Sequence, residues 1–436
     1  MLTRSALLAG VVALSMVSLG TTAHAGGYRQ GDCGAFTVAM IPDTQNYVDY
    51  RHQAWSGFAF DASEQFYGQM RWIRANARSQ GGDIVFASHL GDVWQHYSAW
   101  MDPSHEQRGF KWVPNAGSSV AMSPKVHTRA FEIPGAVLAF DIIDGQLPFS
   151  VVPGNHDYDA LWTDPNDPPR AADDYVGARH VGGLSGYVSA FSNESRLFKG
   201  RDWYVSAHDR GADSAQVFSA GQCRFLHIGL QYHAPEASLR WATEVIAQNP
   251  GLPTIITTHD YLRRDGTRNR LSNPNNAKMD PIDNDPEMIW DEFISRNDQI
   301  FMVLSGHVSG QGYSIDQNRH GGAVHQIMAD YQSRGQTALD AGAPATAIGD
   351  GWLRLLQFNL DGDKPQVRVR TYSTHYNTFS TDLPTYAAWY KRADGQAKLS
   401  DDDFLKRDDF TIALDDFTTR FGDDAARPDP RRQPAD

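Results

Sequence analysis

The sequence predicts an α/β fold, and three features of its pattern support that prediction. Short runs of apolar and β-branched residues alternate with amphipathic helical segments through much of the chain. Five of these runs stop abruptly at short polar clusters, as buried strands that deliver loops do. A hydrophobic fraction of 41% in 436 residues is enough for a sizeable core, which excludes wholesale disorder. This length allows two or three domains, or one large domain with insertions.

The N-terminal part of this pattern predicts a parallel unit of strand, helix and strand. Residues 35–41 (AFTVAMI) are expected to form a buried strand. In residues 63–79, apolar side chains recur at helical spacing, which predicts a helix with Ser63 as its N-cap. Residues 83–90 (DIVFASHL) then form a second strand. Because ligand sites of parallel sheets lie beyond the carboxyl ends of strands, the residues after these strands are candidates for a site.

The next part of the chain is expected to hold an insertion and an antiparallel unit. Residues 93–145 are interpreted as an inserted cap, because the stretch is long and carries tryptophans and a loop ahead of one predicted helix at 134–143. A third strand is predicted at 147–152 (LPFSVV). Between residues 203 and 231, three strand-like runs separated by turn signals predict an antiparallel meander. A helix is predicted at 236–248.

Two further buried strands are predicted in the second half, at 254–258 (TIITT) and 300–305 (IFMVLS). The stretch 263–284 between them is too rich in Asn, Asp, Pro and Arg to pack in a core. A helix is predicted at 286–295, with Asp285 as N-cap ahead of a first-turn proline.

The pattern changes again beyond residue 305. Strands are predicted at 323–329, 352–360 and 366–372, and an Asp-Gly-Asp hairpin signal joins the last two. These three strands are expected to add to a sheet edge.

The ends of the chain differ in composition from its main domain, expected at 26–375. Residues 1–25 combine one arginine, an apolar run and Ala-His-Ala, which predicts a signal peptide cleaved after Ala25 and a secreted or periplasmic protein. A retained anchor is the alternative, although the run is shorter than the ~20 residues of a membrane span. Residues 376–425 are expected to be a C-terminal extension with a strand packing on the domain, and 426–436 a disordered tail.

The only two cysteines, Cys33 and Cys223, are too far apart in sequence for a zinc knuckle or a redox pair. In an exported protein they could form a disulfide, and two buried thiols are the alternative.

The charge balance limits the class of partner. With 39 basic and 52 acidic residues, the net charge is -13, which disfavours binding of nucleic acid by bulk phosphate neutralisation. A local basic patch stays open as an alternative. Arg263, Arg264, Arg268 and Arg270 could clamp a phosphate group or belong to a solvated loop. No later segment is apolar enough to predict a membrane span, and the oligomeric state is left open.

The polar clusters that end the five strands carry groups able to bind a metal ion. They are Asp43-Thr44-Gln45, Gly91-Asp92, Gly154-Asn155-His156-Asp157, His259-Asp260 and Gly306-His307. A single cluster of this kind occurs by chance in many chains, but five at successive strand ends predict one site at a sheet rim.

With these blocks the chain resembles the calcineurin-like metallophosphoesterase family, whose blocks run Asp-x-His, Gly-Asp, Gly-Asn-His-(Asp/Glu), a lone His and Gly-His-x-His. The resemblance spans roughly residues 36–310, and PGNHDY is its most specific piece. It implies an α/β fold with α+β character, in which a two-sheet sandwich of mixed strands is flanked by helices. It also implies a catalytic domain that holds one or two divalent ions, of Mn, Zn, Fe or Mg.

The resemblance also implies roles for individual residues. Asp92 would bridge both ions, Asp43 would serve the first ion, and three further side chains would complete the second. These three are Asn155, His259 and His307. A phosphoester is anionic, so two cations are needed to clamp its oxygens and to activate water.

His156 and Asp157 are the expected catalytic pair in the same block. His156 would be the general acid beside the leaving group, and Asp157 would orient its imidazole ring.

Two departures from the family pattern fall on the first ion. Gln45 and Ser309 stand where the family has histidines, so the Gln45 carbonyl and carboxylates would leave an oxygen-rich set that suits Mn²⁺ or Mg²⁺. We therefore expect one well-held ion and one labile ion. His325 is an alternative source of a missing imidazole, or else an ordinary sheet residue.

The function expected from this resemblance is an exported metal-dependent phosphoesterase that acts on a small phosphorylated substrate. A phosphomonoesterase (phosphatase) is the first expectation and a phosphodiesterase the second. A non-catalytic metal- or phosphate-binding module on the same fold and a nuclease are the alternatives.

Overall fold

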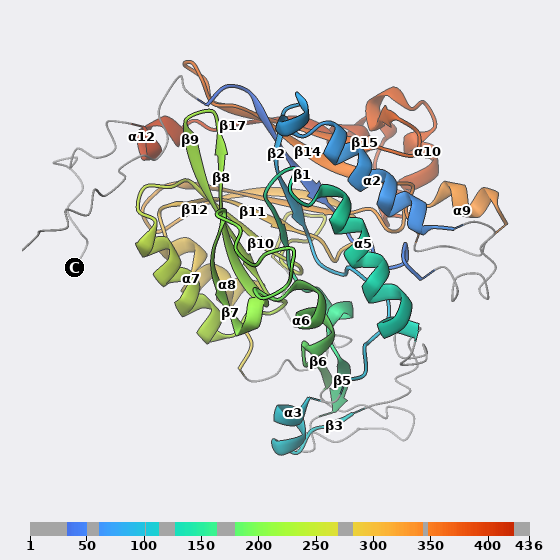
Figure 1. Ribbon diagram of the computed structural model, residues 1–436. Coiled ribbons are helices and arrows are strands. Elements are labelled where there is room, and N and C mark those ends of the chain that lie inside the picture. Colours follow the sequence, from blue (N-terminus) through green and yellow to red (C-terminus); the bar gives the residue numbers. More distant parts are fainter. Residues whose placement is uncertain are drawn as a thin grey trace, which may run out of the picture.

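The computed structural model describes residues 33–49, 61–100, 102–112, 127–163, 179–268, 282–342 and 348–422. They form a mixed α/β fold in which two seven-stranded sheets pack against each other and helices cover their outer faces (Figure 1). This arrangement is compatible with an α/β sandwich. The predicted signal peptide and C-terminal tail lie outside the described residues.

The first sheet has the strand order β16-β15-β14-β1-β2-β4, and β17 also pairs with β15. Its strands are β1 (Phe36–Ile41), β2 (Ile84–His89), β4 (Phe149–Val151), β14 (Trp352–Asn359), β15 (Gln366–Ser373), β16 (Thr378–Phe379) and β17 (Asp409–Ala413). β1, β2 and β4 are parallel, which confirms the predicted parallel unit. The predicted hairpin of β14 and β15 joins this sheet beside β1.

The second sheet has the order β12-β13-β11-β10-β9-β8-β7. Its strands are β7 (Tyr204–His208), β8 (Asp213–Ala220), β9 (Cys223–Leu230), β10 (Thr254–Thr258), β11 (Ile300–Ser305), β12 (Gly310–Gln317) and β13 (Ala323–Asp330). The antiparallel pairing of β7, β8 and β9 confirms the predicted meander. β9, β10, β11 and β13 are parallel neighbours, so four strands end at the same rim.

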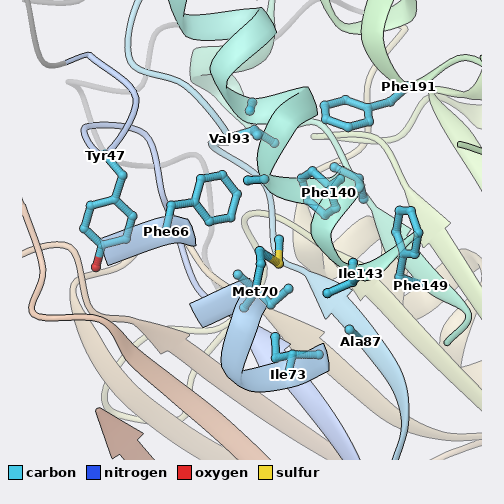
Figure 2. Packing of buried hydrophobic residues seen from close by; sticks show 14 of the residues in the cluster. Tyr47, Phe66, Met70, Ile73, Ala87, Val93, Phe140, Ile143, Phe149 and Phe191 are labelled. Atoms are coloured by element: carbon cyan, nitrogen blue, oxygen red, sulfur yellow. The ribbon is translucent and has the colours of Figure 1, made fainter. Parts of the chain in front are cut away.

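Helices cover both outer faces because each carries an apolar stripe. The first sheet is covered by α2 (Ser63–Ala75), α5 (Ile133–Ile143) and α6 (Ser185–Phe191), and the second by α7 (Glu236–Gln248) and α8 (Pro286–Glu292). Figure 2 shows Phe66 and Met70 of α2 beside Phe140 of α5, and the Phe66 and Phe140 rings are 5.9 Å apart at right angles. These side chains are fully buried and fix the helices on the sheet.

Two predicted helix starts have different outcomes. Asp285 does cap α8, because its Oδ1 accepts a hydrogen bond from the Met288 amide at 2.9 Å. Ser63 is not the N-cap of α2. It is already the first helical residue, and Asp61 accepts its amide hydrogen at 3.0 Å. That helix also ends earlier than expected, at Ala75.

The predicted cap at 93–145 differs from the structure at its C-terminal end. Helix α5, which lies in that range, packs on α2 and the first sheet as part of the main layers. A small sheet projects from the sandwich instead, made of β3 (Lys111–Trp112), β5 (Ala160–Thr163) and β6 (Arg179–Gly182), with α3 (Pro103–Gln107) beside it (Figure 1). It combines a segment of the predicted cap with residues that follow the Gly-Asn-His-Asp block.

The interior between the sheets is aromatic and carries a disulfide. Phe86 of β2 stacks on Phe218 of β8 with ring centroids 4.6 Å apart. Cys33, just before β1, forms a disulfide with Cys223 of β9, so the structure favours this alternative over two free thiols. The bond links the first sheet to the second.

The C-terminal part packs closely on both sheets. Its elements are α9 (Gln336–Asp340), α10 (Tyr386–Tyr390), α11 (Asp401–Lys406), β17 and α12 (Phe417–Phe421). Buried Arg334 and Arg354 both pair with Asp408, at 3.2 and 2.8 Å. Among the described residues, no helix is both long enough and apolar enough to span a bilayer.

Candidate metal centre

The strand ends predicted to share one site do converge. β1, β2 and β4 of the first sheet and β10 and β11 of the second carry the side chains of this site at their carboxyl ends. We call this set the strand-end centre: Asp43, Asp92, Asn155, His259 and His307. Donor atoms of Asp92, His259 and His307 all lie within 4.8 Å of one another.

The histidine-lined half of the centre is built around His259 Nε2. This atom lies 3.1 Å from Asp92 Oδ2, 3.2 Å from Asn155 Oδ1 and 3.2 Å from His307 Nδ1. The other ring nitrogen of His259 donates to the Leu90 carbonyl at 2.8 Å, which turns the lone pair of Nε2 toward the other three donors. Two nitrogens and two oxygens therefore face one point, as the ligands of a bound ion do.

The electrostatics of this half favour a positive charge. Burial lowers the pKa of His259, but the Asp92 and Asp43 carboxylates raise it more, to about 10. Burial raises the pKa of Asp92, yet His259 and His156 bring it well below its usual range. The carboxylates thus stabilise positive charge at His259, at the place where a bound divalent cation would lie.

Backbone features of the motifs bring the ligands this close. A Cβ on Gly154 would overlap the carboxylate and backbone of Asp92, and a Cβ on Gly306 would overlap the Asp43 carboxylate. Asp92 and His307 themselves have left-handed backbones, with φ of 53° and 68°. Such conformations are uncommon for non-glycine residues and are concentrated at functional sites.

The other half of the centre is lined by oxygens. Asp43 accepts a hydrogen bond from the His307 amide at 3.2 Å, and burial together with Asp330 raises its pKa well above the usual value. Gln45 is buried, and its Oε1 has no hydrogen-bond partner among the described residues. Asp330 Oδ2 is likewise buried without one, and burial raises the pKa of Asp330 to about 7. Gln45 Oε1 and Asp330 Oδ2 fit a hard divalent ion, because in the described part of the chain each lacks the partner that a buried polar atom needs.

Asp330 is the residue that the sequence reasoning missed. It ends β13, which runs parallel to β11, so it reaches the same rim as His307. The signal was present, since an acidic residue directly follows the predicted strand at 323–329. A strand expected to add to a sheet edge gives no reason to place its C-terminal residue at the site, although β13 lies beside β11. His325 lies earlier in β13, bonded to the Tyr313 hydroxyl at 3.0 Å, and does not replace the missing imidazole.

His156 lies beside this centre with one ring nitrogen fixed. Its Nδ1 donates to the Gln95 carbonyl at 2.7 Å, and its Nε2 lies 3.9 Å from Asp92 Oδ2 and 3.4 Å from Gln45 Nε2. The side chain is 13% exposed, so it is reachable by a substrate.

The role expected for Asp157 is wrong. Its carboxylate does not orient His156. It accepts hydrogen bonds from the amides of Gly154 at 2.8 Å and Val93 at 2.9 Å. Asp157 therefore ties the loop after β4 to the loop after β2, and the Gln95 carbonyl orients the imidazole.

The arginines after His259 are engaged elsewhere. Arg268 pairs with Glu287 at 2.9 Å and Asp316 at 2.6 Å, and Arg264 donates to the carbonyls of Ser309 and Asp394. Of the two alternatives, a phosphate clamp or a solvated loop, the structure favours neither for these two residues, because protein groups hold both side chains. Arg270 lies outside the described residues.

Comparison with known proteins finds a distant relative and assigns no family. No protein-family model matches the chain. It is 24% identical over 359 residues to the uncharacterized protein YvnB of Bacillus subtilis (strain 168). The match covers 80% of this chain but only 21% of that protein, so the chain spans about a fifth of the length of its relative.

Proposed function

We propose that this chain is a metal-dependent phosphoesterase of the calcineurin-like type, as its sequence blocks suggest. The observation that carries the proposal is the convergence of Asp92, Asn155 and His307 on Nε2 of His259. These residues come from four strand ends in two sheets, and no general packing rule requires such ligands to meet. The finer assignment to the metallophosphoesterase sandwich and to an exported enzyme is part of this proposal.

The residues of the strand-end centre would hold two ions of different character. Asp92, Asn155, His259 and His307 offer a mixed nitrogen and oxygen set that suits zinc, iron or manganese. Asp43 and Asp92, with the oxygens of Gln45 and Asp330 that have no described partner, offer an oxygen set that suits Mn²⁺ or Mg²⁺. Divalent ions at such a site supply Lewis acidity and lower the pKa of water toward ~7.

His156 would supply the proton for the leaving group. Because its Nδ1 hydrogen is held by the Gln95 carbonyl, a protonated ring would present Nε2–H to the departing oxygen. Asp92 also accepts the His156 amide hydrogen at 2.9 Å, which fixes the histidine relative to the centre. This positioned donor favours an esterase over a module that only binds metal or phosphate, since binding alone has little use for it.

A phosphomonoester is the proposed substrate, and a phosphodiester is the second candidate. Nuclease activity on DNA is the third. The test is hydrolysis of p-nitrophenyl phosphate and bis-p-nitrophenyl phosphate after chelation, with Mn²⁺, Zn²⁺ or Mg²⁺ added back. We expect hydrolysis only with added metal. In Asp92→Asn the hydrolysis rate should fall about a thousandfold or more, because the transition state loses several kcal/mol of stabilisation by the metal ions that Asp92 holds.

The matched control is His208→Gln, which alters an imidazole–carboxylate pair away from the centre. It should keep wild-type rates. Equal metal-supported rates in wild type and Asp92→Asn would refute the proposal, and metal binding without hydrolysis of either ester would favour the binding module. Salt-sensitive binding of DNA would point to the nuclease instead.

A further inference from the structure

A second group of imidazoles and carboxylates lies outside the strand-end centre, on the loops after β1 and β2 and on the turn before α5. We propose that Asp49, His96, His127 and Glu132, hereafter the Glu132 cluster, bind a transition-metal ion of the zinc class. This inference goes beyond the proposed phosphoesterase activity and does not depend on it.

Donor atoms of Asp49, His96 and Glu132 lie within 4.8 Å of one another, and His127 lies beside both carboxylates as the fourth proposed ligand. Glu132 Oε1 lies 2.9 Å from His96 Nδ1 and 3.8 Å from His127 Nε2. Asp49 reaches the same two nitrogens with different oxygens: its Oδ2 lies 3.5 Å from His96 Nδ1 and its Oδ1 lies 2.6 Å from His127 Nε2. Metal–ligand bonds of ~2.0 to 2.1 Å in a tetrahedron place neighbouring donors ~3.3 Å apart. These four nitrogen–oxygen separations lie on both sides of that value, so the side chains would have to move to bind one ion.

The carboxylate of Glu132 is oriented in advance by the backbone. Its Oε2 accepts hydrogen bonds from the amides of Gln95 at 3.0 Å and His96 at 3.1 Å, which leaves Oε1 facing the imidazoles. A bonded outer oxygen of this kind commonly fixes a metal-binding carboxylate.

A π-helical turn brings two of the four ligands together. His127 immediately precedes the π-helical turn Thr128–Glu132, so His127 and Glu132 are five residues apart. In a regular α-helix, residues five apart point in different directions, whereas the wider i→i+5 turn brings them onto one side. Such turns are rare and occur frequently at functional sites.

The charge of the cluster is easier to satisfy with a metal ion than with protons. Asp49 and Glu132 are 2% and 0% exposed, and burying two carboxylates is costly unless each is compensated. Two cationic imidazoles here would repel each other, because their ring centroids are only 6.4 Å apart. One divalent ion neutralises both carboxylates and accepts lone pairs from two neutral imidazoles. Two nitrogen and two oxygen ligands in a closed, buried site suit zinc better than Mg²⁺ or Ca²⁺.

The cluster adjoins the strand-end centre through Gln95. The backbone amide of Gln95 donates a hydrogen bond to Glu132, and the backbone carbonyl accepts one from the His156 ring. The side-chain oxygen of Gln95 accepts a hydrogen bond from Gln45 at 3.1 Å. An ion bound by the Glu132 cluster would therefore stiffen the loop that orients His156.

The experiment separates the two centres by metal stoichiometry. The full chain is prepared with Co²⁺ as the only metal in a background of Asp92→Asn with His259→Gln, which removes two ligands of the strand-end centre, including the imidazole around which its histidine-lined half is built. We expect about one Co²⁺ per chain with the intense visible bands of four-coordinate cobalt, and a melting temperature that rises on Co²⁺ addition. Adding His127→Gln should abolish the bands and the rise, while adding His208→Gln should change neither.

Two results would overturn the inference. One is a folded background variant, by circular dichroism, that binds no Co²⁺ at micromolar concentration. The other is equal cobalt content with and without His127→Gln. If the background variant does not fold, the same titration of wild type against His127→Gln decides, because the site requires a difference of one equivalent. None of these measurements uses phosphoesterase activity. They therefore test the Glu132 cluster even if the chain proves not to be a phosphoesterase.

Discussion

Two regions of this molecule gather imidazoles and carboxylates, and the chain reaches them by different routes. In the strand-end centre, parallel strands of two sheets deliver ligands such as Asp92 and His259 to a common rim. In the Glu132 cluster, the ligands come from two loops and an irregular helical turn. The first arrangement follows from sheet topology, whereas the second depends on local backbone geometry.

This difference suggests a catalytic role for the strand-end centre and a structural role for the Glu132 cluster. The strand-end centre lies beside the partly exposed His156, so a substrate can approach it. The side chains of His96, Asp49 and Glu132 are at most 3% exposed, and only His127 of that cluster reaches the surface, at 11%. We therefore expect the strand-end centre to govern catalysis and the Glu132 cluster to govern stability and alignment.

The largest expected effect is on catalysis without loss of metal. His156→Ala should lower kcat by ~10² to 10⁴ for esters with poor leaving groups, and by less for nitrophenyl esters, because a good leaving group needs little protonation. Metal content measured by plasma mass spectrometry should stay at the wild-type level. His127→Gln should show the opposite pattern, with one ion lost and a smaller fall in rate. Equal dependence on leaving group in wild type and His156→Ala would contradict the assignment of the acid.

An intermediate effect is expected at the oxygen-lined half of the strand-end centre. Asp330→Asn should weaken binding of the more labile ion by ~10- to 100-fold, because it removes a buried carboxylate oxygen that has no other described partner. Isothermal titration with Mn²⁺ after partial chelation measures this, and the tighter ion serves as internal control. Unchanged affinity for both ions would show that Asp330 is not a ligand.

The smallest expected effect is on the pH dependence of stability. It distinguishes a pair of side chains that binds a proton from a cluster that binds a metal ion. His208 pairs with Asp213 at 2.9 Å, and this hydrogen bond raises the pKa of His208 above 6.5. The pair should therefore stabilise the fold fully below about pH 6.5, and the stabilisation should fade as pH rises through the higher folded pKa. Because the pair is partly exposed, the free energy of unfolding should differ between wild type and His208→Gln by less than ~1 kcal/mol.

Urea melts at several pH values measure this difference. A metal-linked cluster should behave in the opposite way, because protons displace the ion as pH falls. A His127→Gln destabilisation that grows toward acid pH would therefore argue for protons in the Glu132 cluster.

Much of the fold could be predicted because buried strands leave strong local signals. The runs at 254–258 and 300–305 are strands with those same bounds, since apolar β-branched segments between turn signals have few alternatives. The edge strand β12 was not predicted, because GQGYSIDQ is polar and rich in glycine and its pairing with β13 is decided by tertiary contacts. The small sheet was missed for a similar reason, since β3 and β5 lie far apart in the sequence.

The candidate site was predicted where topology determines it and missed where hydrogen bonds do. Strand ends brought Asp92 and His307 together as expected. The partner of the His156 ring could not be predicted, because a backbone carbonyl carries no sequence signal and the neighbouring Asp157 looked like the natural choice. The Glu132 cluster has no periodic spacing at all, so only the folded chain reveals it.

The disulfide between Cys33 and Cys223 joins layers whose aromatic side chains seal it, and the two cysteines are only 1% and 0% exposed. A reductant added to the native protein could reach the disulfide only when the two sheets separate. The rate of disulfide reduction in the native protein would therefore report the rate at which the two sheets separate. This measurement is independent of any assay for activity or bound metal.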